Sequence, residues 1–170
     1  MKEDRSSGTA LVVAKSQALV ASTPSTRNLV APETRRFVEA ALRRSGKGRF
    51  VAGLQRRWFR SLVRVYEAMM IPGLAMHQVL RKRCIEGVVR RELKAGVRQV
   101  VQVGAGFDAL FHRIHRGYSG VRFVEVDHPA TQRLKREVIA DLGGAGGNLD
   151  LRAHDLTAEG HLNWDTDRRT

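Results

Sequence analysis

Cysteine is almost absent from this chain of 170 residues, in which Cys84 is the only one. A single cysteine excludes an intrachain disulfide, a zinc site built on paired cysteines and a dithiol redox pair. A reducing, cytoplasmic setting is therefore expected. Because Cys84 stands at helical spacing from Leu80 and Val88, we predict that it fills a core position and does not act as a nucleophile.

Long apolar runs are also missing, since no stretch approaches the roughly eighteen apolar residues that a membrane-spanning helix needs. The apolar segment 10–21 is interrupted by Lys15, Ser16 and Gln17. We therefore expect neither a secretion signal nor a membrane as partner. The six histidines show no metal-ligand spacing with nearby carboxylates or thiols, so no metal site is expected.

Acidic residues are scarce: 17 Asp and Glu stand against 30 Lys and Arg, for a net charge of +13. Residues 1–96 hold 20 basic and 7 acidic side chains, whereas residues 97–170 hold 10 of each. We interpret the basic excess as a solvated helix face, with arginine stems lying on apolar neighbours such as Trp58 and Phe59. Nucleic acid is accordingly not expected as a partner, although an acidic partner, RNA included, stays open as an alternative.

Periodicity and chain breakers divide the sequence into two regions. Residues 1–96 form a helical region, which consists of a cap and a lead-in helix. Residues 97–170 form a region in which strands and helices alternate. The helical region is predicted to form helices over 9–22, 32–44, 50–70 and 74–94. The third of these would have one apolar side, made of Leu54, Trp58, Leu62, Val65 and Met69. The alternating region is predicted to form strands over 98–103, 121–126 and 148–154, with helices over 108–115 and 129–142. The predicted fold class is α/β, a helical region followed by the first βαβαβ half of a Rossmann-like sheet.

The segment Val100-Val-Gln-Val-Gly-Ala-Gly-Phe-Asp108 is typical of a buried parallel strand that ends in a glycine turn. Gly104 and Gly106 would let the backbone turn sharply and approach a ligand without a Cβ in the way. Asp127 ends the next predicted strand, where a carboxylate can accept both hydroxyls of a ribose, with Glu125 as its fallback. The spacing also satisfies the loose fingerprint G-x-G-x-x-G/A, so the glycines alone leave NAD and S-adenosylmethionine (SAM) both open.

Four blocks of sequence follow one another in a characteristic order. They are Arg81-Lys-Arg-Cys-Ile-Glu86, Ala95-Gly-Val-Arg-Gln-Val-Val-Gln-Val-Gly-Ala-Gly-Phe-Asp108, Phe123-Val-Glu-Val-Asp-His-Pro-Ala-Thr-Gln132 with Lys135, and His154-Asp-Leu-Thr157. In these blocks the chain resembles the leucine carboxyl methyltransferase-like family of class I SAM-dependent methyltransferases, particularly its bacterial members. With the opening Thr9-Ala-Leu-Val-Val-Ala14, the resemblance extends over nearly the whole chain.

The resemblance implies a cofactor site for SAM. By its match, Arg81 meets the SAM carboxylate, and Gly104 and Gly106 lie beside the amino-acid portion. Asp127 then holds the ribose, and the segment Asp155-Leu156 borders the adenine.

One departure concerns Ala109 and Leu110, which stand where many members have Thr-Arg after the motif aspartate. Any role tied to that arginine is therefore not carried over to this chain.

The implied activity is SAM-dependent O-methylation of a carboxylate or small-molecule acceptor, whose identity the sequence does not specify. A carboxylate acceptor has no proton to lose, so no catalytic base is predicted. The family continues into further strands, so we expect a truncated domain that is incomplete or inactive alone. Its first strand would have an unpaired outer edge and promote self-association. Two alternatives are an NAD-binding Rossmann oxidoreductase fragment and a basic, non-enzymatic interaction module whose binding weakens steeply with salt.

Overall fold

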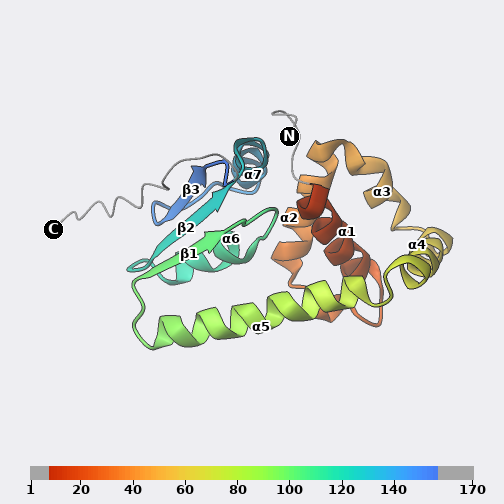
Figure 1. Cartoon of the computed structure of the whole chain (residues 1–170), viewed down its shortest axis with the longest axis horizontal. Coiled ribbons are helices and arrows are strands. Elements are labelled where there is room, and N and C mark those ends of the chain that lie inside the picture. The colour runs from red at the N-terminus through yellow and green to blue at the C-terminus, as the bar shows by residue number, and fades with distance from the viewer. Residues whose placement is uncertain (1–7, 157–170) are drawn as a thin grey trace.

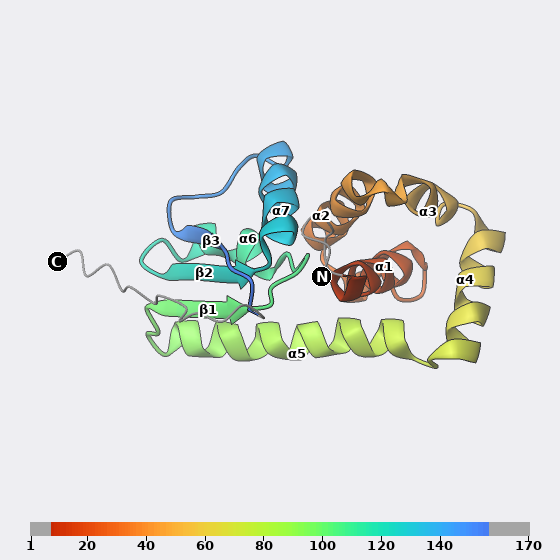
Figure 2. The same ribbon diagram turned by 45° about the horizontal axis from the view of Figure 1, so that its top comes forward.

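The computed structural model describes residues 8–156, in which a group of helices adjoins a small parallel sheet (Figures 1 and 2). The helices of the first half are α1 (Gly8–Ser22), α2 (Pro32–Leu42), α3 (Gly48–Gly53), α4 (Arg57–Met70) and α5 (Leu74–Lys94). The second half runs β1 (Gln99–Val103), α6 (Leu110–Ile114), β2 (Arg122–Asp127), α7 (Pro129–Asp141) and β3 (Leu149–Ala153). Short helical turns cover Arg27–Leu29, Arg43–Lys47 and His115–Gly117.

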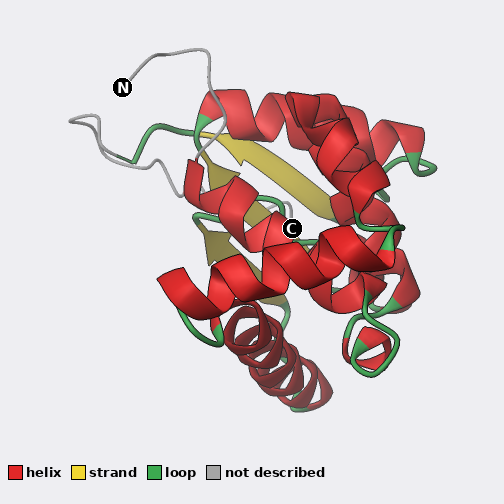
Figure 3. Cartoon of the chain, turned by 90° about the vertical axis from the view of Figure 1, so that its right-hand side faces the viewer, coloured by secondary structure: helices red, strands yellow, loops and turns green. Residues whose placement is uncertain are grey.

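The three strands are parallel and follow the order β1-β2-β3, with Val101 opposite Val124 and Val124 opposite Asp150. Each pair of strands is connected through a helix, as parallel pairing requires. The predicted α/β class and the βαβαβ order are therefore confirmed. Figure 3 shows the strands lying among the helices.

Local sequence explains two of the helix starts. Pro32 and Pro129 occupy the first helical position of α2 and α7, where a missing N–H is not needed and the fixed φ suits the helix. The His128 ring caps α7 by accepting the Ala130 N–H through Nδ1 at 3.3 Å. The predicted bounds of α1, α5 and α7 agree with the observed ones to within one residue.

One continuous core joins the helical region to the sheet. Phe37 of α2 is fully buried beside α6 and α7, and the Phe111 and Phe123 rings meet edge to face at 5.1 Å between centroids. Val138 of α7 and Leu42 of α2 are also fully buried in this cluster. Because α2 packs against elements of both halves, the helical region is held on the sheet by shared apolar burial.

An ion pair lies inside this core. Lys135 of α7 contacts Glu125 of β2, and both side chains have no exposed surface. The Lys135 ammonium also stands 5.8 Å from the centre of the Phe37 ring. Burial raises the pKa of Glu125 above its usual range, and Lys135 opposes that shift only in part.

The predicted helix over 50–70 is wrong in its continuity. Residues 54–56 interrupt it, where the Arg60 guanidinium donates to the Leu54 carbonyl at 2.8 Å. In α4, Phe59 and Val63 pack against the core. Of the side chains predicted to form one apolar side, Leu54 is buried and the other four are exposed: Trp58, Leu62, Val65 and Met69.

The predicted burial of Cys84 and of the first strand is also wrong. α5 packs on its neighbours through Ala75, Val79 and Leu93, so the face with Cys84 is turned outward. β1 pairs with β2 alone among the described residues, and Val103 is 52% exposed. An edge strand has a face and a flank that no neighbour covers, which accounts for the difference.

Candidate functional site

The loop after β1 makes a sharp turn against the end of β2. Gly104 and Gly106 have φ values of +66° and +52°, a left-handed conformation that side-chain-bearing residues rarely adopt. The Gly104 N–H donates to the Val126 carbonyl at 2.8 Å, which fastens the turn to β2. The glycines singled out in the sequence therefore form the turn that was predicted for them.

Gly106 is also in close approach to α1. A Cβ at this position would lie 3.2 Å from the Ala10 Cβ, a spacing tighter than ordinary van der Waals contact. Gly104 has open space around it instead. Gly106 thus brings the loop against the first helix, and Gly104 leaves the loop accessible.

Asp127 completes the turn from the end of β2. Its side chain accepts the Gly106 N–H at 2.5 Å and the His128 N–H at 2.7 Å, one at each oxygen. An ionised carboxylate has about four lone-pair sites, so two acceptor positions remain for a ligand. The predicted carboxylate and the predicted glycine therefore meet directly.

These groups line a cavity of about 570 Å³, which we name the glycine-loop cavity. Its walls are residues 9, 10 and 13 of α1, one side of α5, the exposed edge of β1, and the loop through Asp108 with Asp127. Arg81 of α5 lines it and makes no hydrogen bond or ion pair within residues 8–156. The structure thus brings Arg81, Gly104, Gly106 and Asp127 together around one space of a size suited to a nucleotide ligand.

Lys82 and Asp108, for which the sequence predicted no role, form an ion pair at 2.5 Å in the wall of this cavity. Asp108 also accepts from the Gln102 amide at 3.2 Å and from the Leu110 N–H at 3.0 Å. Burial alone would raise the pKa of Asp108, but the charge and hydrogen bond of Lys82 outweigh it, so its pKa lies below the usual range. The sequence offered one sign of a role for Asp108. An aspartate two residues before a helix can accept a hydrogen bond from the first N–H groups of that helix, as Asp108 does from Leu110 of α6.

Two predicted residues lie outside the lining of the cavity. Asp155 stands near His128, with 3.8 Å between Oδ2 and Nε2, and Leu156 is 49% exposed. Asp155 is nevertheless close to the end of β2, because the His154 N–H donates to the Asp127 carbonyl at 2.8 Å.

Glu125, the fallback for Asp127, is not part of the cavity wall. Its carboxylate is engaged by Lys135 inside the core and is closed off from any ribose. Asp127 alone is therefore placed to accept ligand hydroxyls from β2.

The chemistry of this arrangement is that of binding a polar, nucleoside-like ligand. It offers an uncommitted guanidinium, a carboxylate with open acceptor positions and a loop whose backbone a ligand can approach. Within residues 8–156 no group of three or more His, Cys, Asp or Glu side chains could hold a metal ion. No helix in the same range is both long and apolar enough to cross a membrane.

Comparison with known proteins gives one family match and two curated relatives. Residues 10–162 match the model of a family described as leucine carboxyl methyltransferase. The chain is 38% identical over 69 residues to the S-adenosyl-L-methionine-dependent methyltransferase YktD of Bacillus subtilis (strain 168), a match covering 41% of this chain and 21% of that protein. It is 36% identical over 100 residues to leucine carboxyl methyltransferase 1 of Caenorhabditis elegans, covering 56% of this chain and 29% of that protein. The matched segment thus spans less than a third of the length of either relative.

Proposed function

Because the chain belongs to the leucine carboxyl methyltransferase family, we propose that its glycine-loop cavity binds SAM for methyl transfer to a carboxylate acceptor. The observation that carries the proposal is the convergence of Arg81, the glycine turn and Asp127 on one cavity. When bound, SAM supplies an activated methyl group. The carboxylate acceptor is proposed from the description of the family, leucine carboxyl methyltransferase.

The residues of the cavity fit the three polar parts of SAM. The free Arg81 guanidinium offers two parallel donors to the amino-acid carboxylate, a geometry that favours bidentate pairing. The open acceptor positions of Asp127 suit the two ribose hydroxyls. Gly104 leaves room beside the loop, where a Cβ would otherwise project toward a ligand.

The chain's own residues would act by positioning. Arg81 and Asp127 would hold opposite ends of the ligand, and the Lys82–Asp108 ion pair forms part of the cavity wall. Holding a donor and an acceptor in a reactive geometry accelerates a bimolecular transfer without acid or base catalysis. A carboxylate acceptor is already the nucleophile, so no general base is assigned.

The direct test is an amide NMR titration of the full chain with SAM, with NAD as the control ligand. We expect SAM to shift the resonances of residues 104–108 and of Asp127, and NAD to leave them unchanged. Replacing Asp127 with Asn should weaken SAM binding about tenfold to a hundredfold, the value of one or two hydrogen bonds to a charged group. The matched control is Asp141→Asn, which removes the same charge from an exposed position of α7.

Arg81 has a sharper test, because methylthioadenosine shares the nucleoside of SAM and lacks its amino-acid carboxylate. The Arg81→Gln variant should lose about tenfold in affinity for S-adenosylhomocysteine and keep its affinity for methylthioadenosine. Arg91→Gln, on the same helix and outside the cavity, is the matched control. Equal losses for both ligands would remove Arg81 from the proposed carboxylate site.

A further inference from the structure

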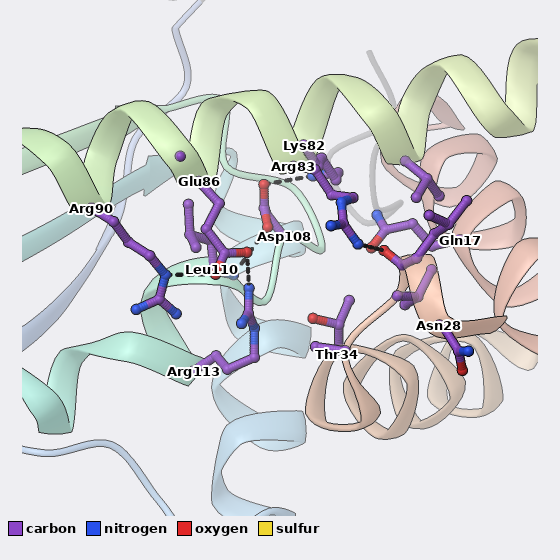
Figure 4. A pocket seen from close by; sticks show the side chains of 15 residues that line it. Gln17, Asn28, Thr34, Lys82, Arg83, Glu86, Arg90, Asp108, Leu110 and Arg113 are labelled. Carbon is purple, nitrogen blue, oxygen red and sulfur yellow. Dashed lines mark hydrogen bonds and ion pairs between the residues drawn. The ribbon is translucent and has the colours of Figure 1, made fainter. Parts of the chain in front are cut away.

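A second cavity, of about 350 Å³, adjoins the first and has a different chemical character (Figure 4). It is enclosed by α1, α2, α5 and α6, and we name it the Gln17 cavity after the α1 residue in its wall. Lys82, Asp108 and Leu110 line both cavities and form the partition between them. A ligand in the Gln17 cavity would therefore be a neighbour of the proposed cofactor and would not occupy its place.

The lining of the Gln17 cavity carries an excess of positive charge. Four basic side chains face two carboxylates: Lys82, Arg83, Arg90 and Arg113 against Glu86 and Asp108. The carboxylates are already engaged, Asp108 by Lys82 and Glu86 by Arg90 and Arg113. Among the four basic side chains, Arg83 is thus left without an acidic partner in the lining of the cavity.

Glu86 stays ionised despite its partial burial. Burial would raise the pKa of this carboxyl, but the hydrogen bonds from Arg113 and Arg90 lower it below its ordinary value. Glu86 therefore neutralises a single positive charge and orients both guanidinium groups around the cavity.

Of the four basic side chains that line the Gln17 cavity, Arg83 has the weakest contact with protein atoms. Its only hydrogen bond within residues 8–156 runs from Nη1 to the Leu29 carbonyl, at 3.4 Å (Figure 4). The remaining N–H groups of this guanidinium make no ion pair with any carboxylate that the structure describes. A planar guanidinium with free donors at the mouth of a cavity is suited to pairing with an oxyanion.

Gln17 gives the second, independent sign of a ligand. The residue is 2% exposed and lines the cavity, and its Nε2 amide has no hydrogen-bond partner within residues 8–156. The Nε of Arg113 is likewise buried without a partner. Buried donors are nearly always paired in folded proteins, so two unpaired donors in one cavity indicate an acceptor that protein atoms do not supply.

We propose that the Gln17 cavity is a binding site for a small organic or inorganic oxyanion, held by Arg83 and by the Gln17 amide. A carboxylate and a phosphate share the required chemistry, a compact group of negative oxygen acceptors. A volume of about 350 Å³ has room for such a small oxyanion. The proposal does not rest on SAM binding, because its residues and its test belong to the second cavity.

The experiment is an amide NMR titration of the full chain with sodium phosphate and, separately, sodium succinate, against sodium chloride at matched ionic strength. The side-chain amide of Gln17 reports on the cavity directly. A saturable shift of this amide with phosphate, with succinate or with both supports the site and identifies the preferred source of the oxyanion. Shifts that are equal in chloride, or that never saturate, would overturn it.

Two variants and one control locate the effect. Arg83→Gln should weaken the binding of the preferred anion about tenfold, the value of one charge-assisted hydrogen bond. Gln17→Leu removes the unpaired donor at similar volume and should weaken it severalfold while the chain stays folded. Arg91→Gln removes one charge from α5 outside the cavity and should leave binding unchanged; if it weakens binding as much as Arg83→Gln does, the site is refuted.

Discussion

Replacing Lys135 with Met should destabilise the fold more than any change at a surface ion pair. Lys135 and Glu125 are both without exposed surface. In the part of the chain that the structure describes, neither the Lys135 ammonium nor the Glu125 oxygens have a further hydrogen-bond partner. Removing the ammonium leaves a carboxylate buried and unpaired. Breaking such a pair from one side lowers the free energy of unfolding by about 3–5 kcal/mol.

The double variant gives a second expected result. If the single loss comes from an unpaired charge, then Glu125→Met combined with Lys135→Met should restore the free energy of unfolding to the parent value or above it. Methionine fills a similar volume and packs well against the Phe37 ring. The matched control is Arg35→Met, which breaks an i,i+4 pair with Glu39 on α2 and should cost about 0.5 kcal/mol or less.

The pH dependence follows from the sign of the Glu125 shift. A carboxyl whose folded-state pKa is raised binds protons more readily in the folded state. Its unfavourable contribution therefore develops as pH rises from the unfolded-state pKa of 4.5 to the raised pKa, and it is fully present above the raised pKa. Without Lys135 that pKa rises further. The loss in Lys135→Met should therefore be largest near neutral pH and smaller in mildly acidic buffer, where Glu125 can be neutral.

Urea unfolding followed by circular dichroism, at neutral pH and in mildly acidic buffer, measures all of these quantities. A single variant within about 1 kcal/mol of the parent would refute the buried-charge argument, being far below the loss for a broken buried pair. A double variant as unstable as the single one would refute it as well, and would assign the loss to packing.

Three further predictions concern the glycine loop, α5 and the Gln17 cavity. Gly104→Ala and Gly106→Ala should each lower the free energy of unfolding in urea by about 1–2 kcal/mol, because both glycines have left-handed φ values. The loss should be larger for Gly106→Ala, whose new Cβ meets Ala10, and adding Ala10→Gly should restore the difference. Cys84 should react with a thiol reagent in the folded state as fast as a model peptide does, because it is exposed. Slow labelling would indicate that Cys84 is buried. Glu86 has a lowered pKa, so it stabilises the fold above its unfolded-state pKa of 4.5, and this stabilisation is lost as pH falls through the lowered folded-state pKa. Glu86→Gln should therefore reduce the decrease of the free energy of unfolding at acidic pH. An unchanged decrease would contradict the lowered pKa of Glu86.

Local patterns were sufficient for most of the elements and of the candidate site, although they did not predict the break at residues 54–56. Pro32, Pro129 and the alternation of apolar runs with glycine breaks act within a few residues, so the helix and strand order could be predicted. Gly104, Gly106 and Asp127 were predictable for the same reason, because each follows directly from the end of a strand. Parallel pairing then brings those ends to one edge.

Tertiary structure decided which faces are covered. Trp58, Leu62 and Met69 repeat at helical spacing, and a periodic apolar face is ordinarily the buried one, yet α4 packs through Phe59 and Val63. The orientation depends on which neighbour reaches the helix, a contact between residues distant in sequence that periodicity does not contain.

The same holds for partners of charged groups. Arg81 could be proposed as a ligand contact from its sequence block, but the Lys82–Asp108 pair, the buried Lys135–Glu125 pair and the unpaired amide of Gln17 emerged only when helices far apart in the chain came together. By itself, the sequence determined the elements, their order and the glycine and carboxylate ends of the strands, because these depend on local backbone chemistry. The tertiary structure decided burial and pairing, because both depend on distances between segments that only the folded chain sets.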